Sequence, residues 1–286
     1  MEFLKYHALG NDYLVLISEN QDFPEAVLTE EQVRKICHRN FGLGSDGILV
    51  GGKSNSEKYF TLRIYNPDGS MAEKSGNGLR IFARSLWDRK MVDHTQFQIK
   101  TSGGLVRAMV ENSGQSVTVE MGCVSFKSDI IPVKGKSREV LNETLEINGE
   151  KITICAATIG NPHCVVLHRK IYSEETRRLG PQLETHPNFP NRTNVQFLEV
   201  LNRNTIRIEI WERGAGYTLA SGSSSCAAAA VAHRLGLCDD EIKVLMPGGK
   251  IEITISENYN ITMRGAVTRI GKMTLDSACF DFEIPA

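Results

Sequence analysis

The feature that most constrains the fold of this 286-residue chain is an internal repeat. The segment GNDYLV at residues 10–15 resembles GNPHCV at residues 160–165. A serine-glycine turn follows each segment, at Ser75 and at Ser221, which are 64 and 60 residues beyond the asparagine of the respective segment. A Gly-Gly pair then follows each serine after 28 and 27 residues. Matches in the same order predict a duplicated unit of about 145–150 residues.

Each half of the chain has the same coarse pattern of short strands and a central helix. Residues 28–42 predict a helix capped by Thr29, with acidic residues in its first turn. Residues 78–90 predict an amphipathic helix, and the alanine-rich residues 224–237 predict a helix that is buried nearly all round. Residues 144–160 predict a hairpin closed by an Asn-Gly turn.

We therefore expect an α+β fold with two pseudo-symmetric domains, each a mostly antiparallel sheet around one central helix. The first domain is expected to span residues 1–127 and to be joined by a C-terminal strand at residues 267–286. The second is expected to span residues 128–266 as a structural repeat of the first.

The two serine-glycine turns suggest a shared site for an anion. Each turn opens a helix, and the free N–H groups and dipole of a helix N-terminus favour a carboxylate. The backbone N–H groups that could hold it belong to Gly76, Asn77, Gly222 and Ser223. If the two turns meet across a cleft between the domains, Ser75 and Ser221 approach a bound molecule from opposite sides. That geometry suits inversion at a carbon beside a carboxylate, where one group removes a proton and the other delivers one to the opposite face.

Several motifs together resemble the diaminopimelate epimerase family over close to the full length of the chain. They are LGND (9–12), NPDGS (66–70), SGNGLR (75–80), GNPHCVV (160–166), LGPQLETHPNFPNRTNVQF (179–197), WERGAGYT (211–218) and PGG (247–249). The resemblance implies two similar domains and interconversion of LL- and meso-diaminopimelate, without pyridoxal phosphate or a metal. It also implies two cysteines, one per domain, that act as thiolate base and thiol acid.

Both of those cysteine positions are serine in this chain, at Ser75 and Ser221. A thiol at a helix N-terminus ionises readily at neutral pH. A serine hydroxyl is far less acidic and needs a neighbouring base, which neither motif obviously supplies. We interpret the chain as an inactive double Cys→Ser form, made to hold substrate without turnover or to avoid a disulfide. The alternative is a natural homologue that has lost or changed its chemistry.

The remaining ligand residues are implied by the resemblance. Asn11 and Asn66 match positions that line the family's site. The distal amino-acid end of diaminopimelate is assigned to four further residues, Asn161, Asn194, Glu212 and Arg213. The planar guanidinium of an arginine can bind a carboxylate through two hydrogen bonds, which suits the distal carboxylate.

Three positions depart from the family pattern and leave the substrate open. Gly47 stands where some members carry a glutamine, and Ser224 and Ser225 replace small residues in the second turn. One alternative is therefore a racemase of a single amino acid such as histidine. Another is a non-catalytic amino-acid binding homologue.

Composition and motifs argue against several other classes of protein. The net charge is −1 and the basic residues are scattered, which argues against a nucleic-acid partner. No apolar run is long enough to span a membrane, and the N-terminus does not read as a signal peptide. The seven cysteines include no C-x-x-C pair, and the adjacent His163 and Cys164 lack further ligands. We expect a cytoplasmic homodimer with reduced thiols, a small amino-acid substrate and no metal or cofactor.

Overall fold

The structure is a computed structural model that describes residues 1–18, 28–53 and 58–281. The chain divides into two compact units. The first unit consists of Met1–Val119 with Gly265–Ala286, and the second of Glu120–Arg264. Each unit is described by itself below.

The first unit is a mixed sheet with two helices. Its strands are β1 (Glu2–Ala8), β2 (Asn11–Ser18), β3 (Ile48–Lys53), β4 (Tyr59–Tyr65), β5 (Met71–Ala72), β6 (Phe97–Thr101), β7 (Gly104–Glu111), β8 (Ser116–Cys123) and β18 (Thr268–Thr274). Its helices are α1 (Glu30–Cys37), α2 (Gly76–Asp88) and the short 3-10 helices η1 (Asn112–Gly114) and η2 (Ser277–Phe280). Neighbouring strands run in the order β18-β1-β2-β3-β4-β6-β7-β8, antiparallel except for β2–β3 and β4–β6.

The second unit repeats this arrangement. Its strands are β9 (Glu143–Ile147), β10 (Glu150–Thr158), β11 (Pro162–Leu167), β12 (Asn194–Asn202), β13 (Thr205–Glu212), β14 (Gly216–Thr218), β15 (Glu241–Met246), β16 (Gly249–Ile255) and β17 (Asn260–Ala266). Its helices are α3 (Ser173–Glu184) and α4 (Gly222–Arg234). Neighbouring strands run in the order β9-β10-β11-β12-β13-β15-β16, antiparallel except for β11–β12 and β13–β15.

The first seven strands of the first order match the seven strands of the second, which confirms the predicted α+β repeat. The parallel pairs fall at equivalent places, and a two- or three-residue strand, β5 or β14, pairs with β4 or β13. One strand differs in origin. The strand beside β1 is β18, from near the C-terminus, whereas the strand beside β10 is β9, which precedes it directly.

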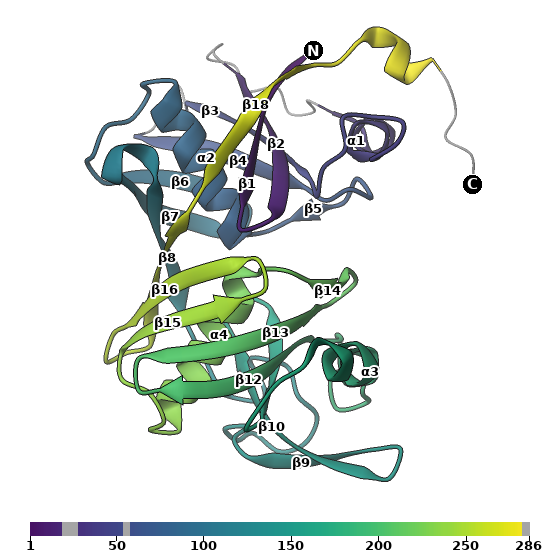
Figure 1. The fold of residues 1–286 in the computed structure, drawn as a ribbon, viewed down its shortest axis with the longest axis vertical. Coiled ribbons are helices and arrows are strands. Elements are labelled where there is room, and N and C mark those ends of the chain that lie inside the picture. Colours follow the sequence, from purple (N-terminus) through teal and green to yellow (C-terminus); the bar gives the residue numbers. More distant parts are fainter. Residues whose placement is uncertain (19–27, 54–57, 282–286) are drawn as a thin grey trace. The chain divides into compact units, whose positions relative to one another are not determined.

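Each unit has one central helix, and the two helices pack against equivalent strands. Helix α2 contacts β1, β2, β3 and β7, and α4 contacts β10, β11, β12 and β16 (Figure 1). Helix α2 was predicted to bury one apolar side, but Gly76–Ala83 are all buried, Arg80 included, so the helix is enclosed more completely than predicted. Residues 226–232 of α4 are all fully buried, because their small side chains let strands approach the helix from several sides.

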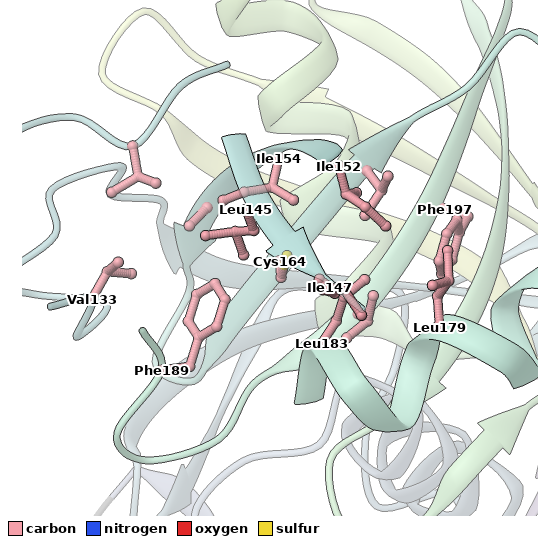
Figure 2. Close-up of a cluster of buried hydrophobic side chains, with 14 of the residues drawn as sticks. Val133, Leu145, Ile147, Ile152, Ile154, Cys164, Leu179, Leu183, Phe189 and Phe197 are labelled. Carbon is pink, nitrogen blue, oxygen red and sulfur yellow. The ribbon is translucent and has the colours of Figure 1, made fainter. Parts of the chain in front are cut away.

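One core cluster of the second unit consists of aliphatic and aromatic side chains from its strands, α3, the loop after α3 and the segment between β8 and β9. Figure 2 shows the side chains of Leu179 and Leu183 on α3 directed into this cluster, together with Phe189 from the loop. All three are at most 3% exposed. This packing fixes the position of α3 and of the loop that follows it.

Several local predictions are confirmed and others need correction. Thr29 caps α1 with a full capping box, and Asn148 and Gly149 close the hairpin with φ of 51° and 82°. The C-terminal strand is shorter than predicted, covering Thr268–Thr274, and residues 282–286 lie outside the described part. Helix α3 was not predicted.

Helix α3 escaped prediction because it contains Gly180 and Pro181, which usually mark a loop. The structure gives a packing reason for the glycine. A Cβ at Gly180 would lie 2.5 Å from the indole ring of Trp211. The close approach of β13 to α3 therefore requires glycine at this position.

Candidate functional site

Both central helices begin at the predicted serines, and the two caps have the same geometry. Ser75 has φ −138° and ψ 120°, and its Oγ accepts a hydrogen bond from Gly78 N at 3.0 Å. Ser221 has φ −144° and ψ 127°, and its Oγ accepts from Ser224 N at 3.5 Å. The N–H groups of Gly76 and Asn77, and of Gly222 and Ser223, belong to the first two residues of the two helices. Each serine thus caps a helix N-terminus, as the sequence predicts, and a helix N-terminus favours anions in general.

The two serine hydroxyls have different neighbours. Ser75 Oγ lies 3.4 Å from the phenol oxygen of Tyr13, whereas Ser221 Oγ donates to Glu212 Oε1 at 3.5 Å. The second turn therefore has a carboxylate beside its serine. A carboxylate is nevertheless much too weak a base to ionise a serine hydroxyl, because their pKa values lie far apart.

A chain of polar side chains supports the first turn. The guanidinium of Arg80, which is fully buried, donates to Asn77 Oδ1 at 2.6 Å. Asn77 Nδ2 donates to Asn11 Oδ1 at 3.0 Å, and Asn11 Nδ2 donates to Asp46 Oδ2 at 3.0 Å. Arg39 in turn donates to Asp46 Oδ1 at 2.6 Å. The charged ends fix which way each amide points, so Asn11 and Asn77, both predicted site residues, are held together and oriented.

Apart from the carboxylate of Glu212, the groups around the second turn are uncharged. His163 is fully buried, and this burial lowers the pKa of its imidazole to about 3, so the ring is neutral. Its Nε2 lies 2.9 Å from Asn161 Oδ1, within hydrogen-bond distance. Gln196 Nε2 donates to Ser224 Oγ at 3.0 Å, and Ser225 Oγ donates to the carbonyl of Ser221 at 2.8 Å. The two extra serines of this turn are thus satisfied groups inside the core.

Asn194 connects the start of β11 to the turn that carries Arg213. Its side chain is almost completely buried, Nδ2 donates to Pro162 O at 2.9 Å, and Oδ1 accepts from Arg213 N at 3.0 Å. The guanidinium of Arg213 donates to Asn191 O at 3.0 Å. The structure therefore brings Asn194, Arg213 and Glu212 into one region of the second unit, with the carboxylate of Glu212 reaching Ser221.

The structure gives a steric reason for the glycine at position 47. Leu14 pairs with Ile48 in the first unit and Cys164 pairs with Val195 in the second, so Gly47 occupies the position equivalent to Asn194. A Cβ at Gly47 would lie 2.6 Å from the ring of Tyr13 and 2.4 Å from a backbone carbonyl. The first unit has no room for an amide side chain at that position.

Asn66 stands apart from the other predicted residues. Its side chain donates to Ser70 Oγ at 3.0 Å, within its own turn, and its backbone N–H donates to the carbonyl of Ser70. Sequence reasoning also missed Tyr13 and Gln196 as neighbours of the two turns. Tyr13 lies two residues beyond Asn11, as His163 lies two beyond Asn161, so the repeat was the available signal for Tyr13.

Within residues 1–18, 28–53 and 58–281, no group of three or more His, Cys, Asp or Glu side chains could hold a metal ion. The same residues contain no helix that is both long and apolar enough to cross a membrane.

Cys164 is buried, and this burial raises the pKa of its thiol strongly. The adjacent His163 and Cys164 therefore act as core residues of the second unit.

Solved structures with a similar fold cover nearly the whole chain. A probable proline racemase from Agrobacterium radiobacter K84 matches with a TM-score of 0.72 at 16% identity, over 98% of this chain and 94% of that chain. A hydroxyproline epimerase from Agrobacterium vitis matches with a TM-score of 0.68 at 18% identity, over 96% and 90%. At such identities the likeness concerns the fold alone.

Sequence comparison is more specific. The family model described as diaminopimelate epimerase matches residues 3–127 and 155–270. "Diaminopimelate epimerase 2" of Nostoc sp. (strain PCC 7120) is 57% identical over 283 residues, 99% of this chain and 98% of that protein. The diaminopimelate epimerase of Moorella thermoacetica is 35% identical over 282 residues, 96% of this chain and 100% of that protein. The chain belongs to the diaminopimelate epimerase family.

Proposed function

We propose that this protein binds diaminopimelate at the two serine-capped helix N-termini, and that its site is built for inversion of one α-carbon. The observation that carries the proposal is the duplicated cap. Ser75 and Ser221 differ by only a few degrees in φ and ψ, in a chain of the diaminopimelate epimerase family. Two equivalent helix N-termini are suited to hold one carboxylate with both dipoles.

Inversion requires one acid/base group on each face of the α-carbon. With cysteine at positions 75 and 221, a thiolate takes the α-hydrogen and the opposite thiol delivers its own proton to the carbanion. This mechanism requires the two turns to face each other across the bound amino acid. With serine at both positions neither group ionises at neutral pH, so the protein binds its ligand without inverting it.

The second unit has the groups that a second amino-acid end needs. Arg213 can form paired hydrogen bonds to a distal carboxylate, and the amides of Asn161 and Asn194 can accept from an ammonium or donate to a carboxylate. Asn194 also fixes the backbone of Arg213, with Oδ1 at 3.0 Å from its N–H. These groups favour a substrate with two amino-acid ends over one with a single end.

Calorimetry with diaminopimelate and with histidine tests this proposal. The Arg213→Met variant is expected to weaken diaminopimelate binding by about 2–5 kcal/mol, because it leaves the distal carboxylate without its cation. Binding of a mono-amino acid should hardly change. Arg203→Met is the matched control, since Arg203 pairs with Asp239 on the same unit and is exposed. If the unmodified protein binds histidine but not diaminopimelate, the hypothesis of a single-amino-acid racemase replaces this proposal.

A further inference from the structure

A buried carboxylate lies beside the turn that carries Arg213. Glu184 is the last residue of α3, and it is only 4% exposed. Its Oε1 accepts from the Arg192 guanidinium and from Gly214 N at 2.9 Å, and its Oε2 accepts from Trp211 Nε1 at 2.7 Å. A buried carboxylate is costly unless it is paired and hydrogen-bonded, and these three donors satisfy that requirement.

These hydrogen bonds join three separate segments of the second unit. Arg192 belongs to the loop after α3, Trp211 to β13, and Gly214 to the turn between β13 and β14. The backbone carbonyl of Glu184 also accepts from Thr193 N at 3.1 Å, which holds the end of the same loop. Glu184 therefore fixes the loop, the strand and the turn relative to one another.

The turn is held from two sides at consecutive residues. Asn194 Oδ1 accepts the N–H of Arg213 at 3.0 Å, and Glu184 Oε1 accepts the N–H of Gly214 at 2.9 Å. The carbonyl of Asn191, from the loop that Glu184 anchors, accepts from Arg213 Nη1 at 3.0 Å. The direction of the Arg213 side chain thus depends on two segments that meet at the carboxylate of Glu184.

We infer that Glu184 is a positioning residue that directs the Arg213 guanidinium toward a second carboxylate on the bound amino acid. The inference rests on the proposed function for the identity of the ligand. Glu184 acts through the backbone N–H of Gly214 and through the loop, and its own oxygens are occupied by protein donors.

The packing around Glu184 makes a conservative variant practical. Leu179, Leu183 and Phe189 anchor α3 and the loop in the core independently of the carboxylate (Figure 2). Glu184→Gln keeps the size of the side chain but offers one acceptor and one donor to three donors. If its oxygen stays with Arg192 and Gly214, its NH₂ faces the N–H of Trp211, and the donor-donor conflict loosens the site.

The first measurement is hydrogen exchange at the amides of Arg213 and Gly214, followed by NMR without any ligand. Glu184→Gln should speed exchange at Gly214 about tenfold, as expected when one hydrogen bond to a charged acceptor weakens. Glu175→Gln is the matched control, because Glu175 is on the same helix but pairs with His168 and Arg178. An unchanged exchange rate at Gly214 in folded Glu184→Gln overturns the inference.

The second measurement compares the affinity for diaminopimelate with that for lysine, which is the same molecule without the distal carboxylate. Glu184→Gln should lower the diaminopimelate-to-lysine affinity ratio about tenfold, and Glu184→Gln with Trp211→Phe should recover part of it because the conflicting N–H is gone. A merely structural defect would weaken both ligands alike, and that outcome overturns the inference. Failure of the unmodified protein to bind diaminopimelate would instead refute the proposed function, while the exchange measurement would still decide the role of Glu184.

Discussion

The two capped turns, at Ser75 and at Ser221, have the same backbone conformation but differ in the charged residues around them. Five residues after the cap serine, the first unit has the buried guanidinium of Arg80, and the second has Cys226. Nine residues before the cap, the first unit has the neutral Asn66, and the second has the carboxylate of Glu212, which reaches Ser221. In the first unit a buried cation, Arg80, projects from the helix itself. In the second unit an anion, Glu212, lies beside the cap of the helix.

This difference teaches that a duplicated fold need not hold duplicated chemistry. A base and its partner acid need different environments, since the environment sets which group gives up its proton. In the proposed function the two equivalent caps share one task, which is to hold a carboxylate. The unlike residues around Ser75 and Ser221 supply the asymmetry, and each unit contains one tryptophan, Trp87 or Trp211, that can report on it separately.

The largest effect is expected for the buried cation of the first unit. Arg80→Met removes the donor that fixes Asn77, and through Asn77 the orientation of Asn11. The free energy of unfolding of the first unit should fall by about 3 kcal/mol, in the range for breaking a buried charged hydrogen bond. Urea unfolding followed by Trp87 fluorescence, in a Trp211→Phe background, measures it.

Cys226→Ala is the matched variant at the equivalent position of the second unit. It removes one small buried group and should cost only about 1 kcal/mol, as for a small cavity. Equal losses from Arg80→Met and Cys226→Ala would break the comparison, because the two helices would then rely equally on their interior residue.

An intermediate effect is expected from pH. The folded pKa of His163 is lowered to about 3 by burial, from 6.5. The unfolded chain therefore binds a proton below pH 6.5 that the folded second unit excludes, and stability falls as the pH drops from there toward 3. Between pH 6.5 and 4.5 the loss should be about 2 kcal/mol, from about 1.4 kcal/mol per unit of pH once the unfolded histidine is protonated.

Acid unfolding of the second unit, followed by Trp211 fluorescence in a Trp87→Phe background, tests this expectation. In the first unit Tyr13 stands at the position of His163, and a phenol gains no proton at acid pH. His163→Gln should flatten the pH dependence of the second unit in that window. A slope that persists in His163→Gln would assign the acid sensitivity to other groups.

The smallest effect concerns the caps. Ser75→Ala and Ser221→Ala each remove the hydroxyl that accepts from the third residue of the helix, and each should cost about 0.5–1 kcal/mol. Ser75 should matter slightly more, because its hydrogen bond is 3.0 Å long and that of Ser221 is 3.5 Å. Thermal unfolding of both variants makes the comparison, and opposite signs of the two effects would contradict equivalent caps.

The sequence predicted the features that depend on local pattern. Repeat spacing located both caps, and the small residues of α4 indicated a helix enclosed by strands. Features that depend on tertiary approach were not predictable in this way. The match between Gly47 and Asn194 needs the strand register, and the contact of Glu212 with Ser221 needs the approach of β13 to α4.

The missed helix α3 shows the same limit. Its Gly180 and Pro181 have low helix propensity, and only the indole of Trp211 packed against Gly180 explains why a glycine is kept there. Glu184, at the end of that helix, could not be given a role from the sequence for the same reason. Its three donors come from residues 8 to 30 positions away, and they meet only in the folded unit.

The most direct test of the account is exchange of the α-hydrogen of diaminopimelate with heavy water, followed by proton NMR. The serine form is predicted to bind the ligand and to exchange its α-hydrogen very slowly. Ser75→Cys with Ser221→Cys, kept reduced, should restore exchange and inversion, whereas either change alone should leave inversion badly impaired because one face lacks its acid/base group. Rapid exchange in the unmodified serine protein would contradict the claim that the two cap positions are the acid/base pair of this site.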